Sequence, residues 1–429
     1  MVLAAFADQK YKKHLCGGER QESVMGPRDN LTGIYKTLEG GLFSSVTKAD
    51  VGTAITGLAS RGCALMCWAD PFFPDHVMPK HIEEAVVQCI REGMGPHYTM
   101  PIGDGKLKEL IAARLKRDHL IEVSPERNIV ITPGSDSGLL FAMTPFIGQG
   151  DEVLVHSPSY PSNFLNPDLL GGKCVPVPTR EENNYQLEIE EYRRRLTNRT
   201  KMVILTQPNN PTTTVYRREC LEQLAQFVIE NNLILVVDYA FEDMIYDGIE
   251  LFDISRIEGM WERTLSVHSI SKGMALSGLR VGYVVADDRI MDVMYGYTVN
   301  IIGATNTSAQ QGAIAAFSEP SFVDEYKKIF EKRRRTAFEL FNSIPGVSMR
   351  LPESSYLSWV DVSKLGTSAE VSKYILDNAQ VLVNEGPPYG PGSEGYLRIV
   401  HGCYRDEEVA ASAMRRIRDA LLKLSSEKL

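Results

Sequence analysis

The stretch KMVILTQPNNPTTTVYRRECLEQLAQFVIENNLILVVD, residues 201 to 238, decides the fold class of this chain. Its first and last segments, KMVILT and LILVVD, are short apolar runs rich in β-branched residues, which favours buried strands. Between them, RRECLEQLAQFVIE repeats apolar residues at the spacing of an amphipathic helix. A strand, a helix and a second strand in this order predict a parallel pair joined through the helix.

The same alternation continues on both sides of this unit, from about residue 80 to residue 300. Further candidate strands are NIVIT (128–132), EVLVH (152–156), KCVPV (173–177), TLSVHS (264–269) and VGYVVA (281–286). We therefore expect an α/β fold, with a large domain built on a doubly wound, mostly parallel sheet in three layers.

The two ends of the chain differ from this central region. Residues 1–66 are rich in Gly, Ser and Thr, whereas residues 320–429 alternate a long charged helix pattern with strands such as LSWVDV and GYLRIV. The second pattern suits a smaller α+β domain, and 429 residues exceed the usual size of a single core. We expect an N-terminal segment of residues 1–80 that contributes to the small domain, a large domain of residues 81–310 and a small C-terminal domain of residues 311–429.

Composition and charge exclude several classes of protein. Hydrophobic residues make up 43% and charged residues 24%, which is ordinary for a soluble globular protein. The net charge of -9 argues against a surface for nucleic acid or for an anionic membrane. No apolar run approaches the roughly 18 residues that a membrane-spanning helix needs, and the apolar stretch in MVLAAFADQKYKKH is too short for a signal peptide. We therefore expect a cytoplasmic protein.

The cysteines lack the paired spacing of a zinc site or of a disulfide framework. The seven are Cys16, Cys63, Cys67, Cys89, Cys174, Cys220 and Cys403. We expect them to be reduced and mostly buried, and we predict no metal site.

In doubly wound sheets, ligands bind beyond the carboxyl ends of the strands, so the residues after each strand are the candidates for function. After NIVIT comes PGSDSGLLFAMTPF, in which small polar residues open an apolar helix. Free N–H groups and the helix dipole at Gly134, Ser135 and Asp136 could bind a phosphate. The alternative is a capped helix without a ligand, because Ser and Asp are common caps.

Two further strand ends carry residues suited to a planar ligand. Tyr160, in SPSYPS after EVLVH, could stack on a ring or simply pack against its neighbours. Asn210, in QPNNPTTT after KMVILT, is held by the following proline and could donate a hydrogen bond to a ligand oxygen. An ordinary Asn-Pro turn is the alternative there.

Charged residues follow two more strands. Asp238 ends the strongly apolar strand LILVVD, where an isolated charge is costly, so we expect either a cationic partner or a helix cap. Lys272 follows TLSVHS; most lysines are solvated surface charges, but a lysine in a dry site beside other cations becomes a nucleophile toward carbonyls. Arg280, eight residues later, offers a planar fork that suits a phosphate.

These residue types together imply a ligand with a phosphate, an aromatic ring with a cationic nitrogen, a ring oxygen and an aldehyde. Pyridoxal 5'-phosphate has all four groups. From PKHIEEAV (79–86) to GYLRIV (395–400), the chain resembles the fold-type I aminotransferases of class I/II, which use this cofactor. The resemblance covers most of the sequence, and the ordered set of motifs is specific for the cofactor.

The resemblance implies a role for each of these residues. Lys272 would form a Schiff base with the cofactor and shuttle the α-proton of the substrate, and Asp238 would pair with the pyridine nitrogen. Asn210 would hold the ring oxygen and Tyr160 would stack on the ring. The phosphate would lie among Gly134, Ser135, Asp136, Ser269 and Arg280.

The resemblance also implies how substrate binds and how subunits assemble. Arg398, in GYLRIV, corresponds to the arginine that grips the substrate α-carboxylate, and Ala69, in WADPFF, occupies the position of a glycine in the substrate loop. Tyr98 resembles the tyrosine that reaches the cofactor of the neighbouring subunit, which implies a homodimer with shared active sites. Residues 81–310 would then bind the cofactor, and the N-terminal segment would cover the active site.

The sequence departs from the family pattern at three positions. Phe241 stands where a tyrosine usually donates to the ring oxygen, Ala69 replaces the loop glycine, and Thr213 replaces a glycine after the Asn-Pro-Thr turn. Without the tyrosine donor, we expect the Lys272 linkage to keep its proton to higher pH than usual. Tyr239 is the candidate to compensate for the missing hydroxyl.

The leading functional hypothesis is an aminotransferase that moves the amine of an amino acid to a 2-oxo acid. A lyase, a decarboxylase or a cyclase on the same fold is the alternative, because sequence does not fix which substrate bond breaks. A cofactor-binding regulator without turnover is the second alternative. Arg20 or Arg28 is the candidate for a second carboxylate-binding arginine, and we expect neither nucleic acid nor membrane as a partner.

Overall fold

The computed structural model describes residue 31 and residues 57–429. The chain divides into a unit of Met1–Glu39 and a unit of Gly40–Leu429, and all the elements named below belong to the second unit. Arg20, Arg28 and Cys16 lie outside the described residues, as does most of the segment expected to cover the active site.

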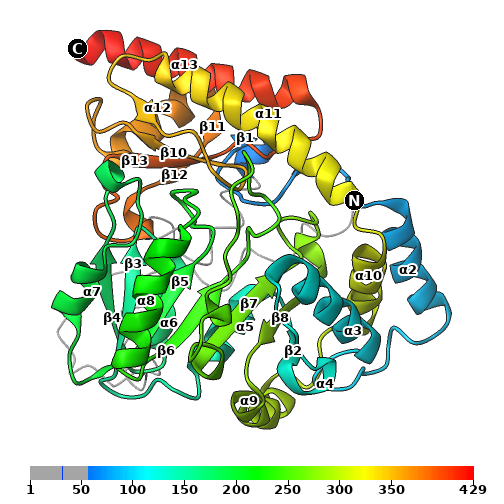
Figure 1. Cartoon of the computed structure of the whole chain (residues 1–429). Helices are drawn as coiled ribbons and strands as arrows, with labels where there is room; N and C mark the ends of the chain where they lie inside the picture. The colour runs from blue at the N-terminus through cyan, green and yellow to red at the C-terminus, as the bar shows by residue number, and fades with distance from the viewer. Residues whose placement is uncertain (1–30, 32–56) are drawn as a thin grey trace, which may run out of the picture. The chain divides into compact units, whose positions relative to one another are not determined.

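A seven-stranded sheet forms the centre of the second unit (Figure 1). Its strands are β2 (Ile129–Thr132), β3 (Glu152–Ser157), β4 (Lys173–Pro178), β5 (Thr200–Thr206), β6 (Ile234–Asp238), β7 (Thr264–Ser269) and β8 (Gly282–Val285). They lie in the order β2-β8-β7-β6-β5-β3-β4, and only β8 runs antiparallel to its neighbours β2 and β7. The mostly parallel sheet predicted from the sequence is therefore confirmed.

The strands are apolar on both faces because both faces are covered. Met202 and Ile204 of β5 pack in one core, and the alternating residues Val203 and Leu205 pack in another. The first core includes residues of helices α5 (Ser135–Met143) and α9 (Asp288–Ile301), and the second includes residues of α7 (Ile189–Arg195) and α8 (Arg218–Glu230). These are the three layers of a doubly wound fold.

A second, smaller sheet of four antiparallel strands uses residues of the C-terminal part of the chain. Its strands are β9 (Ser348–Met349), β10 (Leu357–Asp361), β12 (Asn384–Glu385) and β13 (Tyr396–Val400). Helices α11 (Phe322–Asn342), α12 (Ser368–Ala379) and α13 (Glu407–Lys428) accompany it (Figure 1). A short parallel pair, β1 (Ala64–Leu65) with β11 (Val381–Leu382), brings the residues before the large sheet to this part of the chain.

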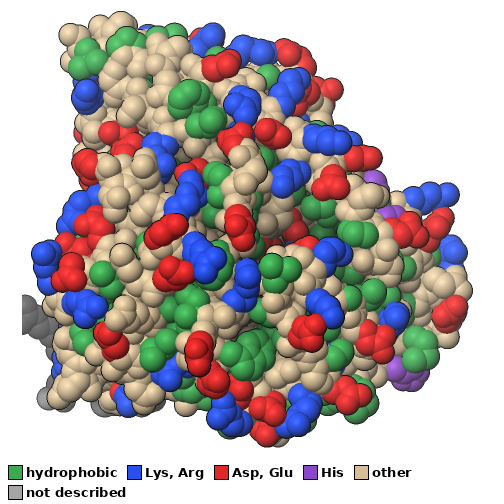
Figure 2. All heavy atoms as spheres, viewed as in Figure 1, with side chains coloured by type: hydrophobic (Ala, Val, Ile, Leu, Met, Phe, Trp, Pro, Cys, Tyr) green, Lys and Arg blue, Asp and Glu red, His purple; other side chains and the backbone are tan. Residues whose placement is uncertain are grey.

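The remaining helices complete the described part of the second unit. They are α2 (Lys80–Arg91), α3 (Gly105–Arg114), α4 (Pro125–Asn128), α6 (Pro161–Leu169) and α10 (Thr307–Ser318), with short turns η4 (Leu115–His119), η5 (Glu181–Asn183), η6 (Ile254–Arg256), η7 (Trp261–Arg263), η8 (Ser277–Leu279) and η9 (Pro387–Tyr389). None of the described helices is long and apolar enough to cross a membrane. Acidic and basic side chains are interspersed on the face shown in Figure 2.

The register of the sheet gathers the strand ends singled out from the sequence. Thr206 pairs with Asp238 across β5 and β6, and Ser269 pairs with Gly282 across β7 and β8. Because β8 runs in the opposite direction, its first residue lies beside the last residues of β2 and β7. The carboxyl ends of the other six strands and the beginning of β8 therefore meet at one edge.

Candidate active site

A cavity of about 420 Å³ lies at this edge of the sheet. Nine of the residues predicted from the sequence line it: Ala69, Ser135, Asp136, Tyr160, Asn210, Asp238, Lys272, Arg280 and Arg398. Arg398 comes from β13 of the small sheet, and Ala69 comes from the loop after β1. The cavity therefore combines residues that are up to 329 positions apart in the sequence, counting from Ala69 to Arg398 (398 minus 69).

Three predicted residues lie outside the cavity wall. Gly134 caps α5, directly before Ser135. Ser269 is buried at the end of β7, where its Oγ accepts a hydrogen bond from the backbone of Ser271 at 3.1 Å. Tyr98 is 92% exposed and does not line the cavity of its own chain.

The turn before α5 is shaped for close approach of an anion. Gly134 has a φ of +83°, and a Cβ built on it would lie 2.4 Å from Nη2 of Arg280. The Arg280 guanidinium thus covers the N-terminus of a nine-residue helix, where free N–H groups already favour negative charge. Asp136 lies near the same guanidinium, 3.8 Å from Nη2, but its side chain is mostly exposed. The geometry suits a phosphate.

Asp238 is a buried carboxylate without a cation beside it. Its side chain is 4% exposed and accepts a hydrogen bond from the backbone N–H of Ala240 at 3.0 Å. Among the described residues, none offers it an ion pair. Burial raises the pKa of Asp238 to about 7, because the charged form loses its hydration. A cationic ligand nitrogen would supply the missing partner.

Lys272 contributes a partly buried amine to the same cavity. Its Nζ donates to the carbonyl oxygen of Ala69 at 2.7 Å. Burial lowers the pKa of Lys272 to about 8; Asp136 and Asp70 oppose this shift, and Arg398 adds to it. The amine therefore loses its proton more readily than an exposed lysine does, and the uncharged amine is the nucleophilic form.

Arg398 is fully buried and lacks a carboxylate partner among the described residues. Its guanidinium donates to Asn384 Oδ1 at 2.8 Å, to the carbonyl oxygen of Cys67 at 3.0 Å and to Asn210 Oδ1 at 3.2 Å. Its partners are neutral, so they orient the cation without neutralising it. A carboxylate in the cavity would complete the site.

The structure corrects the expectation for Tyr239 and places Phe241 where the sequence predicted. Phe241 lines the cavity and packs edge to face on Tyr356, with ring centroids 5.5 Å apart. Tyr239 is absent from the cavity wall; its ring stacks on His268 at 5.1 Å. Side chains alternate in direction along an extended chain, so Tyr239 points away from the side that Asp238 faces. Tyr239 therefore does not compensate for the missing hydroxyl.

Sequence reasoning missed several residues of the wall. They are Trp68, Asp70, Leu139, Ala240, Ser271, Ser277 and Gly278. Trp68 and Asp70 flank Ala69, and Ser271 precedes Lys272. These three residues could therefore have been predicted from their position next to predicted site residues. Trp68 is 46% exposed and stacks on Phe73 at 5.8 Å, which places an aromatic surface at the cavity.

The fold and the cavity define an enzyme site for a ligand with a phosphate, a cationic ring and a carbonyl group. Asp238 and Arg398 are buried and each lacks an opposite charge among the described residues, and the turn at Gly134 leaves room for an anion. These features fit pyridoxal 5'-phosphate together with an amino acid. The family described as aminotransferase class I and II matches residues 70–417. The chain belongs to this family and is a pyridoxal 5'-phosphate-dependent aminotransferase.

Named relatives agree with this assignment. The aspartate aminotransferase of Pyrococcus abyssi is 32% identical over 349 residues, which are 80% of this chain and 89% of the relative. Aromatic-amino-acid aminotransferase 2 of Thermococcus litoralis is 30% identical over 86% of this chain and 93% of its own length. The crystal structure of the aromatic aminotransferase from Pyrococcus horikoshii OT3 superposes with a TM-score of 0.79 at 30% identity, covering 85% of this chain and 99% of that one.

Proposed function

We propose that this chain transfers the amino group of a neutral or aromatic α-amino acid to a 2-oxo acid. The observation that supports transamination most directly is the presence of Lys272, Asp238 and Arg398 in one cavity. Asp238 and Arg398 are buried and Lys272 is partly buried, and neither Asp238 nor Arg398 has an opposite charge within ion-pair distance among the described residues. Buried charges of this kind are costly unless a ligand completes them.

The residues that would hold the cofactor follow from the geometry. Asp238 would bind the ring nitrogen, Asn210 the ring oxygen and Lys272 the carbonyl carbon, with Tyr160 against the ring. Gly134, Ser135, Asp136, Ser269 and Arg280 would surround the phosphate, with Asp136 contributing its backbone N–H rather than its carboxylate. When bound, pyridoxal 5'-phosphate supplies an electron sink for the α-carbon of the substrate.

The chain's own residues would bind the substrate and move its α-proton. Arg398 would fix the α-carboxylate, because its hydrogen bonds to Asn384 and Cys67 hold the guanidinium in one orientation. Lys272, with a pKa lowered to about 8 by burial, would accept the α-proton and return it to another carbon. The carbonyl oxygen of Ala69 would orient Nζ for both transfers.

The wall of the cavity favours a neutral or aromatic side chain in the substrate. Trp68, Tyr160 and Phe241 supply aromatic surface. The cations that the described residues contribute are Lys272, Arg280 and Arg398, and each already has a proposed partner. Asp70 adds negative charge, which disfavours a side-chain carboxylate.

Assembly and location complete the proposal. The exposed Tyr98 supports a homodimer in which this side chain reaches the partner's cofactor. The six described cysteines are free, four of them buried, which is in keeping with a reducing compartment such as the cytoplasm.

Transamination is tested by giving the purified, cofactor-loaded protein a panel of amino acids together with a 2-oxo acid, without oxygen. We expect equal amounts of the matching 2-oxo acid and of the newly aminated product by mass spectrometry. Release of ammonia, carbon dioxide or a thiol, without amination of the acceptor, would instead identify a lyase or decarboxylase. The Arg398→Met variant should lose activity chiefly through a higher KM.

A further inference from the structure

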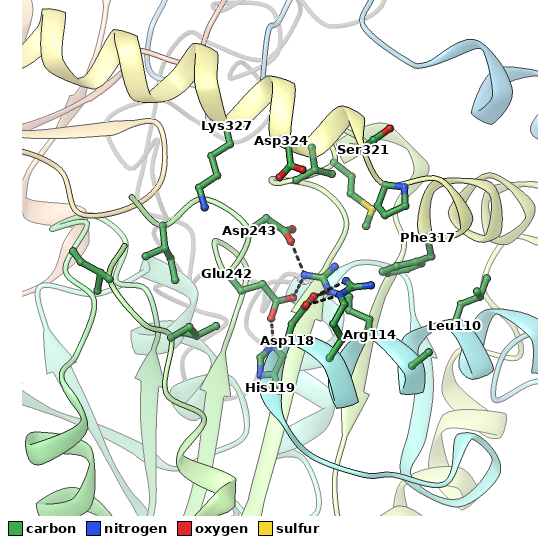
Figure 3. Close-up of a pocket in the computed structure, with 18 of the residues that line it drawn as sticks. Leu110, Arg114, Asp118, His119, Glu242, Asp243, Phe317, Ser321, Asp324 and Lys327 are labelled. Atoms are coloured by element: carbon green, nitrogen blue, oxygen red, sulfur yellow. Dashed lines mark hydrogen bonds and ion pairs between the residues drawn. The ribbon is translucent and has the colours of Figure 1, made fainter. Parts of the chain in front are cut away.

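Arg114 lies behind the proposed active site, at the inner end of a second cavity of about 840 Å³. It is the last residue of α3 and is 5% exposed. Its Nη2 donates to Glu242 Oε1 at 2.9 Å and to Asp243 Oδ1 at 2.7 Å (Figure 3). One buried guanidinium therefore holds two consecutive carboxylates of the segment that follows Asp238.

This segment is the wall between the two cavities. Ala240 and Phe241 line the proposed active site, whereas the next two residues, Glu242 and Asp243, line the second cavity. The segment after β7 divides in the same way, with Lys272 in the first cavity and Met274 in the second. Consecutive residues of both segments therefore face different cavities and are linked directly through the backbone.

Asp243 touches the backbone beside Lys272. A Cβ built on Gly273 would lie 2.0 Å from Oδ2 and 2.4 Å from Cβ of Asp243, so the carboxylate occupies the space a side chain would need. Arg114 holds the other oxygen of this carboxylate. Arg114 therefore contacts Asp243, Asp243 contacts Gly273, and Gly273 is bonded to Lys272 through the backbone.

The second carboxylate continues the network inward. Glu242 Oε2 lies 2.7 Å from Nε2 of His119 and 3.0 Å from Nδ1 of His268, the residue before Ser269. Nδ1 of His119 lies 2.7 Å from Asp253. Burial opposes ionisation of Glu242, but Arg114 and the two histidines outweigh it and hold its pKa well below the ordinary range.

These contacts argue against two other uses of the cluster. Atoms of His119, Glu242 and His268 lie within 4.8 Å of one another, close enough to hold a metal ion. The Arg114 guanidinium, 2.9 Å from the same carboxylate, would repel a cation there. Arg114 is itself neutralised by two carboxylates, so it offers little to an anionic ligand in the second cavity.

We propose that Arg114 is a positioning residue that fixes Lys272 and Asp238 in place by holding Asp243 against Gly273 and Glu242 against His268. This inference rests on the proposed role of Lys272 as the residue that binds the cofactor. Both hydrogen bonds come from Nη2, at the tip of the long arginine side chain, and the guanidinium keeps its charge although it is buried. Lysine in its place would keep the charge but not the geometry.

The test compares the cofactor-loaded Arg114→Met and Arg114→Lys variants with the wild-type protein. The readouts are the dissociation constant of pyridoxal 5'-phosphate and the visible circular dichroism per bound cofactor, which reports the orientation of the ring. We expect Arg114→Met to weaken cofactor binding about tenfold or more and to change the dichroism, because a small misplacement of anchoring groups is costly. For Arg114→Lys, the dissociation constant and the dichroism should lie between those of the wild type and those of Arg114→Met.

Two control variants separate positioning from general loss of stability. Arg334 is another fully buried arginine, bonded to Asp247 at 2.6 Å and to the carbonyl oxygen of Pro352 at 2.7 Å. Arg334→Met should lower the melting temperature yet leave cofactor affinity and dichroism within about twofold of wild type. Arg117 lines the second cavity but is largely exposed. Arg117→Met should therefore leave the melting temperature, the cofactor affinity and the dichroism close to those of the wild type.

The outcomes are distinct for each proposal. If Arg114→Met affects the protein no more than Arg334→Met does in both readouts, the positioning role is overturned. If Arg114→Met does not fold, Asp243→Asn tests the same contact with less loss of charge, and we expect the same change in dichroism from it. If the visible absorption band of the wild-type protein also appears unchanged in the Lys272→Ala variant, the proposed role of Lys272 is overturned, and the positioning role with it.

Discussion

Nζ of Lys272 and the carbonyl oxygen of Ala69 lie 2.7 Å apart, although 203 positions separate these residues in the sequence. The same carbonyl accepts a hydrogen bond from the Tyr356 hydroxyl at 3.1 Å. The loop after β1 thus presents a fixed acceptor to the amine of Lys272. Cys67, two residues before Ala69, presents another carbonyl to Arg398 at 3.0 Å. One loop therefore orients both groups that we propose to act on the substrate.

Tyr356→Phe tests this orientation. Loss of the hydroxyl frees the Ala69 carbonyl, and a typical hydrogen bond of about 1 kcal/mol corresponds to a roughly fivefold fall in kcat. Steady-state kinetics should show this fall with little change in KM. Tyr192→Phe is the matched control, because Tyr192 is buried in another core and its hydroxyl has no described partner. An unchanged kcat in Tyr356→Phe would show that the hydrogen bond from Tyr356 to the Ala69 carbonyl does not help to orient Lys272.

Phe241→Tyr should restore the hydroxyl that the family usually supplies. Phe241 lines the cavity, so the added hydroxyl would face the site proposed for the cofactor. A hydrogen bond to a charged oxygen is worth about 1.5–3 kcal/mol, so the midpoint of the visible absorbance titration should fall by roughly one to two pH units. An identical midpoint in both proteins would show that the hydroxyl does not control this proton.

Gly282→Ala should damage the phosphate corner. The added Cβ would lie 2.6 Å from the carbonyl carbon of Gly134 and 2.7 Å from the backbone nitrogen of Ser135, and backbone cannot move aside as a flexible side chain can. We expect weaker cofactor binding and a loss of about 1–3 kcal/mol in the free energy of unfolding. Gly296→Ala is the control, because nothing lies within 4 Å of its added Cβ and it does not line the cavity. Equal behaviour of the two variants would contradict the close approach of β8 to the α5 turn.

His119 should make stability depend on alkaline pH. Burial alone would lower the pKa of His119, but hydrogen bonds to Asp253 and Glu242 outweigh it and raise that pKa from 6.5 to about 10. The bound proton therefore stabilises the fold fully below about pH 6.5, and this contribution is lost as the pH rises toward 10. Unfolding measured from pH 6 to 10 should show this loss in the wild type and a flatter profile in His119→Gln. Parallel profiles would mean that His119 is neutral in the folded chain.

Asp70→Asn should widen the range of substrates. Removing negative charge from the cavity wall should raise kcat/KM for aspartate relative to phenylalanine by several-fold, since Arg280 and Arg398 remain. The ratio of the two kcat/KM values is the measurement. A ratio that stays constant would show that Asp70 does not select against acidic side chains.

The parts of this fold and site that sequence predicts are the local ones. Each apolar run between 128 and 286 became a strand within a residue or two, because β-branched runs buried on both faces have few alternatives. Asp238 and Lys272 were predicted because they directly follow such runs. The role of Arg398 needed resemblance to a family, because nothing local to β13 indicates that it meets Asn210.

The parts that sequence could not predict depend on distant contacts. In the sequence, Arg114 looks like an ordinary exposed arginine on a helix. Only the packing of α3 places it beside Glu242, which lies 128 positions later. His119 and Asp253 meet in the same way across 134 positions. The mistaken expectation for Tyr239 is different, because alternation along the strand would have directed its ring away from Asp238.

The reversed direction of β8 has a consequence for how the site could be transplanted. Because β7 ends at Ser269 and its antiparallel neighbour begins at Gly282, both Lys272 and Arg280 lie on the single connection between two adjacent strands. The covalent anchor and the ionic anchor proposed for the cofactor therefore lie on one hairpin, so an exchange of residues 264–285 between relatives would move both together. Asp238, on a separate parallel strand, would have to be supplied by the recipient.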